Sequence, residues 1–222
     1  MELSGYGCED HFLEEDTTRH CWESVQSILQ SDATDHMLVD VGMPLMHKGV
    51  RYNCRIFMLD RKIILIRPKL CLANDGNYRE TRWFTAWTRR DLEDFPLPHS
   101  IRAATGQYSV PIGHAIVQCD DASVAIETCE ELFTPDAPHV ELSLAGCDII
   151  ANGSGSHHSL RKLEIRLALI RNATSKAGGG YLYANQQGCD GGRVYYGRAT
   201  HHTVVCAEYN ERSSCLRLIE SD

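Results

Sequence analysis

Cys129 stands at the kind of position from which proteins present a nucleophile. An apolar run over residues 124–127 predicts a strand and residues 130–133 predict a short helix, so the thiol lies at a strand-to-helix junction. Backbone amides at the start of a helix favour a thiolate, and serine hydrolases expose their nucleophile on a strained elbow at such a junction. Two carboxylates, Glu127 and Glu130, flank the cysteine. On position alone, a buried structural cysteine is the alternative interpretation.

Lys69 is the second candidate for chemistry. It follows Pro68 at the end of an apolar run over residues 62–67 that predicts a strand. A lysine at the mouth of a strand can hold a base or stabilise an oxyanion. The alternative interpretation is a solvated surface lysine.

The histidines offer a metal site as a further alternative, and their spacing argues against it. Two adjacent pairs, at 157–158 and 201–202, would point to opposite faces of a strand and would chelate poorly. Cys8, Asp10 and His11 lie close together, but the sequence holds neither a His-Glu-x-x-His motif nor a Cys-x-x-Cys pair. The glycine run at 178–180 follows a predicted helix instead of preceding one, so it does not indicate a phosphate loop.

The elements that must position these residues follow from the spacing of apolar side chains. Helical spacing predicts one helix over residues 9–30 and a second, amphipathic helix after residue 159. The apolar face predicted for the second helix consists of Leu160, Leu163, Leu167 and Ile170.

Short apolar runs predict the strands. Asp60-Arg61 separates two of them and is short enough for a hairpin turn, whereas residues 83–87 form an aromatic patch on a loop or short helix and residues 95–98 are irregular. The predicted strands cover residues 37–43, 52–59, 62–67, 114–119, 124–127, 147–152 and 181–185. Strands and helices alternate, which indicates an α/β fold. The periodicity degrades after residue 196, so we place a domain boundary there and expect a divergent tail over residues 197–222.

Composition and charge exclude several classes of protein. Of the 222 residues, 43% are hydrophobic and 23% are charged, which is typical of a globular protein and not of a disordered one. Lys and Arg number 22 against 30 Asp and Glu, giving a net charge of −8. We therefore expect no nucleic-acid partner and no membrane association, since both need a positive footprint. The densest basic cluster is interrupted by acidic residues and predicts a solvated, mixed-charge face.

The ten cysteines bear on the cellular compartment. The N-terminal residues have neither a basic region nor an apolar core, so no signal peptide is expected. Without a leader, the cysteines are interpreted as reduced thiols of a cytoplasmic protein.

Several motifs together resemble one family. The chain is similar to the glutaminase domain of eukaryotic glutamine-dependent NAD synthetases, which belongs to the nitrilase, or carbon–nitrogen hydrolase, superfamily. The resemblance is collinear over residues 2–196. The motifs that carry it are Leu3-Ser-Gly-Tyr-Gly-Cys-Glu-Asp10, Asp40-Val-Gly-Met-Pro44, Arg51-Tyr-Asn-Cys-Arg55, Ile66-Arg-Pro-Lys69, Asn77-Tyr-Arg-Glu80, Arg82-Trp-Phe-Thr85, Thr128-Cys-Glu-Glu-Leu132, Asn152-Gly-Ser-Gly-Ser-His-His158 and Ala184-Asn-Gln-Gln-Gly-Cys-Asp190.

The resemblance implies a fold and a set of roles. The implied fold is an α/β (α+β), four-layer α-β-β-α sandwich, here incomplete at the N- and C-termini. Family members use a Glu–Lys–Cys triad, so Cys129 would be the nucleophile and Lys69 the partner that stabilises the oxyanion. Glu130 would help to recognise the α-amino group of the substrate glutamine. The residues in motifs that line or approach the glutamine pocket are Tyr6, Tyr78, Phe84, Ser154 and Ser156.

The resemblance also implies partners and cofactors. The glutaminase half needs no cofactor and no metal, whereas ATP and magnesium belong to a synthetase domain that would follow it. Members of the family are oligomeric, so the parent enzyme is expected to be a homo-oligomer.

The sequence departs from the family pattern at both ends. Met1 occupies the position of a Leu that follows the general-base Glu, so we expect residues 1–196 to lack the base and the first strand and helix. Glu2 would lie about 6.6 Å further along the same strand face. Glu127 or Glu2 would then have to replace the base. An inactive fragment or pseudoenzyme is therefore an alternative, and a hydrolase of other amides or nitriles is a second one.

Overall fold

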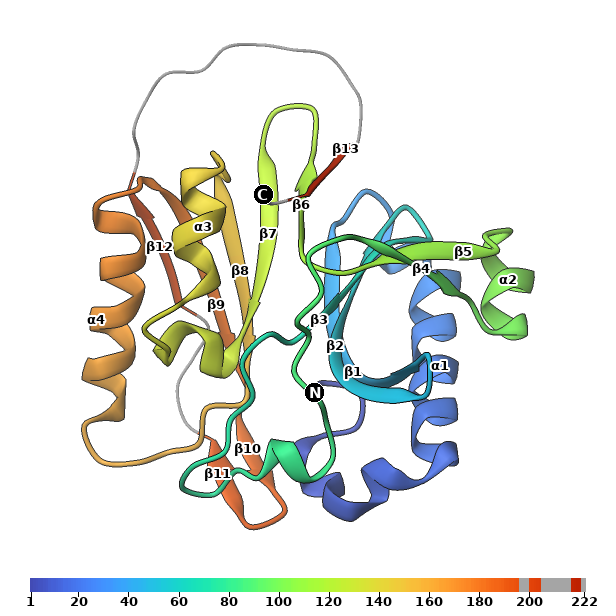
Figure 1. The fold of residues 1–222 in the computed structure, drawn as a ribbon, viewed down its shortest axis with the longest axis horizontal. Helices are drawn as coiled ribbons and strands as arrows, with labels where there is room; N and C mark the ends of the chain where they lie inside the picture. Colours follow the sequence, from blue (N-terminus) through green and yellow to red (C-terminus); the bar gives the residue numbers. More distant parts are fainter. Residues whose placement is uncertain (196–199, 205–216, 221–222) are drawn as a thin grey trace. The chain divides into compact units, whose positions relative to one another are not determined.

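The chain divides into two units, Met1–His114 and Ala115–Asp222, each with its own main sheet. The computed structural model describes residues 1–195, 200–204 and 217–220 (Figure 1). Both units combine a sheet with helices, so the mixed α/β class predicted from the sequence is confirmed.

The first unit contains a five-stranded sheet in the order β1-β2-β3-β5-β4. The first three strands form an antiparallel meander, β5 runs parallel to β3, and β4 pairs with β5 in antiparallel fashion. The strands are β1 Val39–His47, β2 Val50–Leu59, β3 Lys62–Pro68, β4 Glu93–Pro96 and β5 Ser109–Ile112. β4 and β5 lie where the sequence predicts no strand, since both are four residues long and both contain a proline.

Two tight turns set the register of this meander. Asp60 and Arg61 both adopt positive φ, 46° and 62°, as do Lys48 and Gly49 at 48° and 78°. Positive φ at both central residues defines the type I′ turn, whose twist matches that of paired strands. The hairpin turn predicted at Asp60-Arg61 is thus confirmed.

The helices of the first unit are α1 Glu15–Gln30 and α2 His99–Thr105, with the 3₁₀ helices η1 Tyr6–Leu13, which is kinked at Glu9, η2 Asp32–Thr34 and η3 Glu80–Arg82. The single helix predicted over residues 9–30 is wrong, because Glu14 is extended and separates η1 from α1. Trp22, Val25 and Leu29 of α1 pack into the core of the sheet, whereas Phe12 of η1 joins a separate aromatic cluster.

The second unit contains a six-stranded sheet in the order β12-β9-β8-β7-β6-β13. Its centre, β7-β8-β9, is parallel, and α3 and α4 form the crossover connections along one face (Figure 1). The strands are β6 Ala115–Gln118, β7 Ser123–Thr128, β8 Ile149–Ser154, β9 Gly179–Asn185, β12 Thr200–Val204 and β13 Arg217–Glu220. The remaining elements are η4 Cys129–Phe133, α3 Pro138–Leu144, α4 Lys162–Ser175 and the hairpin β10 Gly188–Asp190 with β11 Arg193–Tyr195. β12 and β13 come from the segment for which the sequence predicts no element.

The buried face of α4 differs from the predicted one. Leu160 precedes the helix and is 90% exposed, and Leu163 is 53% exposed. Ile170 is buried as predicted, and Leu167 is half-buried. The other buried side chains of the helix are Arg166, Ala173 and Thr174, which the predicted stripe did not include. Arg166 lies on this face over the ring of Tyr183.

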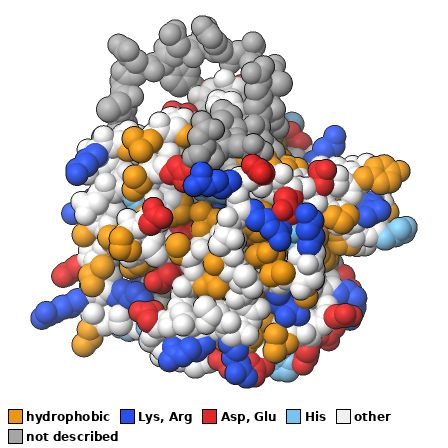
Figure 2. Space-filling model, in the orientation of Figure 1, with side chains coloured by type: hydrophobic (Ala, Val, Ile, Leu, Met, Phe, Trp, Pro, Cys, Tyr) orange, Lys and Arg blue, Asp and Glu red, His pale blue; other side chains and the backbone are white. Residues whose placement is uncertain are grey.

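The described surface is mixed in charge. Basic and acidic side chains are interspersed on the face shown in Figure 2. In the basic cluster, Arg82 binds Asp10 through two nitrogens and Arg89 binds Glu93, which agrees with the predicted mixed-charge face. Among the residues with described positions, no helix is both long and apolar enough to cross a bilayer.

Candidate functional site

Cys129 sits on a strained elbow. It is the first residue after β7 and opens η4, which confirms the predicted strand-to-helix junction. Its φ of 47° is left-handed, a conformation that costs a residue with a Cβ about 1–2 kcal/mol. Two hydrogen bonds hold the elbow: Cys129 N–H donates to Asn152 Oδ1 at 2.9 Å, and Thr128 N–H donates to Glu131 Oε2 at 2.6 Å. The structure thus provides a nucleophile position that is fixed from two sides.

The neighbouring strands place the two predicted serines in the same unit as Cys129. Ser154 ends β8, and its hydroxyl accepts a hydrogen bond from Tyr183 Oη at 2.6 Å. Burial, and after it the nearby Cys129 thiol, raises the pKa of Tyr183 above its usual range, so this hydroxyl remains protonated. Asn185 holds the backbone of Ser156 by accepting from its N–H and donating to its carbonyl. Glu130 is half-buried in η4.

Lys69 lies in the first unit, directly after β3, and is buried. Its Nζ donates to Glu80 Oε2 at 2.6 Å, and neither side chain is exposed. A buried ion pair is stable only when its remaining polar atoms are satisfied. The other donors to Glu80 meet that condition: Tyr6 Oη and Asn53 Nδ2 reach Oε1 at 2.9 and 2.8 Å, and Ala73 N–H reaches Oε2 at 2.6 Å. The interpretation of Lys69 as a solvated surface residue is wrong.

Aromatic rings pack around this ion pair. Tyr6 and Tyr78 meet edge to face with ring centroids 5.2 Å apart, and Phe84 lies 5.0 Å from Phe12. All four belong to one buried cluster. The structure therefore brings Tyr6, Tyr78 and Phe84 together in the first unit, and Cys129, Glu130, Ser154 and Ser156 in the second.

Sequence analysis missed three buried residues that complete these arrangements. Glu80 ends one of the quoted motifs, and Asn53 and Asn152 lie within two others. Their membership of a motif was the available signal. Asn53 and Glu80 are 27 residues apart in the sequence, and Cys129 and Asn152 are 23 residues apart. No rule based on local spacing detects contacts over such separations.

Neither carboxylate considered as a replacement base is free for that role. Glu2 Oε1 accepts from Arg55 at 2.6 Å, and its Oε2 accepts from Gly42 N–H at 2.6 Å. Although burial alone would raise the pKa of Glu2, the Arg55 guanidinium lowers it well below the usual range. Glu127 accepts from Tyr181 on one oxygen and from His139 on the other. A general base must reach the thiol proton, and each oxygen of these two side chains already accepts a hydrogen bond from a group of its own unit.

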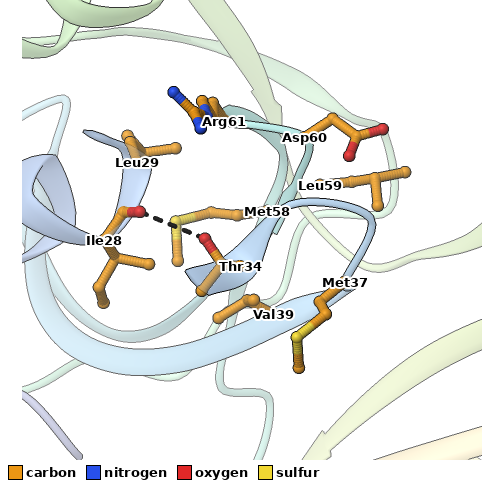
Figure 3. Close-up of a pocket in the computed structure, with 9 residues that line it drawn as sticks. All are labelled: Ile28, Leu29, Thr34, Met37, Val39, Met58, Leu59, Asp60 and Arg61. Atoms are coloured by element: carbon orange, nitrogen blue, oxygen red, sulfur yellow. Dashed lines mark hydrogen bonds between the residues drawn. The ribbon is translucent and has the colours of Figure 1, made fainter. Parts of the chain in front are cut away.

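A small pocket elsewhere in the first unit holds none of the predicted site residues. It lies beside the end of α1 and is lined by mostly apolar side chains such as Met37, Val39 and Met58, with Thr34 donating to the carbonyl of Ile28 at 3.3 Å (Figure 3). Within the described part of the chain, no three His, Cys, Asp or Glu side chains are arranged to hold a metal ion.

Comparisons with known proteins identify close relatives. The chain is 59% identical over 198 residues to the glutamine-dependent NAD(+) synthetase of Dictyostelium discoideum, a match that covers 88% of the chain and 28% of that protein. It is 58% identical over 197 residues to the enzyme of the same name from Oryza sativa subsp. indica, covering 88% of the chain and 27% of the relative. The chain thus spans little more than a quarter of the length of these relatives.

Solved structures and a family model agree with this result. The crystal structure of a glutamine-dependent NAD(+) synthetase from Cytophaga hutchinsonii matches with a TM-score of 0.76 and 29% identity, over 97% of this chain and 34% of that one. An amidase of the nitrilase superfamily from Nesterenkonia sp. AN1 shares the fold at 11% identity, with a TM-score of 0.65 over 97% of this chain and 72% of that one. The carbon-nitrogen hydrolase model matches residues 1–202. Together with the cysteine elbow and the buried lysine–glutamate pair, this match shows that the chain belongs to the carbon–nitrogen hydrolase family.

Proposed function

We propose that this chain hydrolyses the side-chain amide of glutamine and that the ammonia serves NAD synthesis from deamido-NAD. The observation that carries the proposal is the left-handed elbow at Cys129, found in a chain 58–59% identical to glutamine-dependent NAD(+) synthetases. A cysteine held rigidly at the mouth of a parallel sheet suits covalent catalysis. The extended match to synthetases favours glutamine over the nitriles and small amides of other family members.

The proposed reaction has two steps. The sulfur of Cys129 attacks the amide carbon of glutamine, the carbon–nitrogen bond breaks, and ammonia leaves with the proton released by the thiol. Water then attacks the γ-glutamyl thioester and releases glutamate, returning a proton to the sulfur. Lys69 is proposed to stabilise the tetrahedral oxyanion. Its buried pairing with Glu80 supports that role, because such a partner keeps an ammonium charged in a dry environment.

We propose roles in substrate recognition for the remaining site residues. Glu130 binds the α-amino group of glutamine. The other proposed substrate-binding residues are Tyr6, Tyr78, Phe84, Ser154 and Ser156. The proposed glutaminase reaction needs no cofactor. ATP and magnesium act in a synthetase domain of a longer, homo-oligomeric protein located in the cytoplasm.

The engagement of Glu2 and Glu127 favours a second candidate, an inactive chain that binds glutamine without hydrolysing it.

Ammonia release from glutamine by the 222-residue chain tests the proposal. Cys129→Ala should abolish release, whereas Cys119→Ala, which removes a thiol from a loop of the same unit, should leave it unchanged. A folded wild-type chain that releases no ammonia refutes hydrolysis by this chain. Binding of glutamine by that silent chain, measured by calorimetry, would identify the inactive alternative.

A further inference from the structure

A line of buried polar side chains crosses the parallel strands of the second unit and ends at the backbone of Cys129. His139 contacts Glu127 Oε1 through Nδ1 at 2.9 Å, and Glu127 Oε2 accepts from the hydroxyl of Tyr181. That hydroxyl accepts from Asn152 Nδ2 at 2.9 Å, and Asn152 Oδ1 accepts from Cys129 N–H at 2.9 Å. We call the three buried members, Glu127, Tyr181 and Asn152, the elbow relay.

The strand register explains how the relay is assembled. Glu127 on β7 pairs directly with Asn152 on β8, and Tyr181 on β9 pairs with Ile150, two residues before Asn152. Residues two apart lie on one face of a strand, so the three side chains share the face that α3 and α4 cover.

The direction of each hydrogen bond is fixed by its neighbour. Cys129 N–H can only donate, so the asparagine presents its oxygen to the elbow and its amide nitrogen to Tyr181. Tyr181 then has its proton free to donate to Glu127. Burial, followed by the nearby carboxylate of Glu127, raises the pKa of Tyr181 well above its usual range and keeps that proton in place.

The surroundings make a purely packing role a poor explanation for these residues. Ala125 and Ile150 lie in the same apolar cluster as Tyr181, to which α4 contributes Ile170, and the three relay members are at most 1% exposed. A polar side chain in such a core is costly unless every group is paired. Apolar side chains would fill the space at lower cost, and they could not hold the Cys129 amide.

We propose that Asn152, Tyr181 and Glu127 are positioning residues that hold Cys129 in its left-handed conformation and thereby fix the direction of its thiol. The catalytic consequence rests on the function proposed above, whereas the hold on the elbow does not. Asn152 occupies the amide of Cys129, so this N–H cannot serve the oxygen of a substrate. A strained conformation persists where several interactions determine it together. The elbow relay supplies one such interaction, the hydrogen bond between Cys129 N–H and Asn152 on the neighbouring strand.

Tyr181→Phe breaks the relay in its middle by removing one oxygen. The readout is hydrogen exchange of single backbone amides in the 222-residue chain, followed by NMR. We expect the Cys129 amide to exchange about tenfold faster, the effect of about one net hydrogen bond, while amides paired between β7 and β8 keep their protection. A role confined to global stability would instead accelerate all amides of the unit together, and that result would overturn the proposal.

Two further variants complete the design. Tyr52→Phe removes the same atom from a buried tyrosine of the first unit and should leave the Cys129 amide unchanged. If Tyr181→Phe does not fold, His139→Ala opens the line at its outer end, where the ring is 13% exposed, and keeps the backbone donor of residue 139 to Glu127. Its Cys129 amide should also exchange faster, by a smaller factor, and an unchanged rate would overturn the proposal.

Glutamine turnover separates this inference from the proposed function. In an active chain, Tyr181→Phe should lower kcat about tenfold and leave KM nearly unchanged, because the thiol is misdirected while the pocket is intact. A wild-type chain that releases no ammonia, with selective exchange at Cys129 in the variant, refutes the function and retains the relay. A wild-type chain that hydrolyses glutamine, with an unchanged exchange rate of the Cys129 amide in Tyr181→Phe, supports the function and refutes the relay.

Discussion

At the scale of single residues, Glu80 contributes to the stability of the first unit through the hydrogen bonds that its carboxylate accepts. Its two oxygens accept from Lys69, Tyr6, Asn53 and a backbone amide, which uses the four lone-pair sites of a carboxylate. Glu80→Gln should lower the free energy of unfolding by about 3–5 kcal/mol, because it leaves the ammonium of Lys69 buried without a counter-charge. Urea denaturation measures this loss.

The matched control is an exposed pair of the same unit. Asp35→Asn removes the carboxylate that binds Arg61 through two nitrogens at the surface, and should cost less than about 1 kcal/mol. Equal losses in the two variants would contradict the reading of Lys69 and Glu80 as a buried pair.

His114 should make the stability of the chain sensitive to acid. Burial, and after it the charge of Arg67, lowers its pKa from 6.5 to about 3, and neither ring nitrogen has a hydrogen-bond partner among the described residues. Between these two pH values the unfolded chain binds a proton that the folded chain does not, so stability falls as the pH falls through this window. His114→Leu should therefore lose about 2 kcal/mol less than the wild type between pH 8 and pH 5.

Urea titrations at both pH values give the comparison. His99→Gln is the control, since that histidine is exposed and its removal should leave the pH dependence as it is in the wild type. A pH dependence that persists in His114→Leu would show that the histidine is protonated in the folded chain.

At the scale of elements, strands were easier to predict than the faces of helices. Apolar runs placed β2, β3, β7 and β9 to within two residues at each end. In β2 and β7 the reason is burial on both faces, which leaves a continuous apolar signal. β4, α2 and β5 escaped prediction because they are short. The α4 stripe was predicted only in part, because an arginine whose charge meets an aromatic ring lies on the buried face, which a hydrophobicity pattern cannot show.

Two truncations in α4 test the observed face. Ile170→Ala should lower the free energy of unfolding by about 2–5 kcal/mol, since this side chain is fully buried. Leu163→Ala should change it by less than about 0.5 kcal/mol, because that leucine is 53% exposed. Ile170 belongs to both the predicted and the observed stripe, so Leu163→Ala is the variant that separates them. A loss as large as that of Ile170→Ala, measured by thermal or urea unfolding, would place Leu163 on the buried face.

The candidate site was predictable to the extent that its members stand in motifs. Cys129 could be singled out from its junction alone, and Lys69 from its place at the end of a strand. Glu80 and Asn152 could not, because their importance depends on partners in other strands. Tertiary contacts of this kind are invisible to a reading by period and spacing.

At the scale of the whole molecule, thiols spread over both units report how the chain unfolds. Burial raises the pKa of Cys21 in the first unit, and of Cys147 in the second, to about 11 from 9.0. The reactive thiolate is thus about 100-fold scarcer than at an unshifted thiol. Exposed Cys189 should therefore be alkylated by iodoacetamide at neutral pH before Cys21 and Cys147, which are protected.

Peptide mass spectrometry along a urea titration resolves the order of exposure. Cys21 and Cys147 becoming reactive at one urea concentration would show that the two units unfold together, and different concentrations would show that they unfold separately. Labelling of Cys147 as fast as Cys189 in the absence of urea would contradict its burial.

The four hydrogen bonds that Glu80 accepts affect the rate at which the first unit unfolds. Its donors lie 74, 27, 11 and 7 residues away along the chain, so the carboxylate is fully engaged only after η1, β2 and the segment following β3 have met. We expect this set of contacts to form after the folding transition state, with a φ-value near zero. Loss of this carboxylate should then accelerate unfolding far more than it slows folding, so that Glu80 governs how long the folded unit lasts and has little influence on how fast it forms.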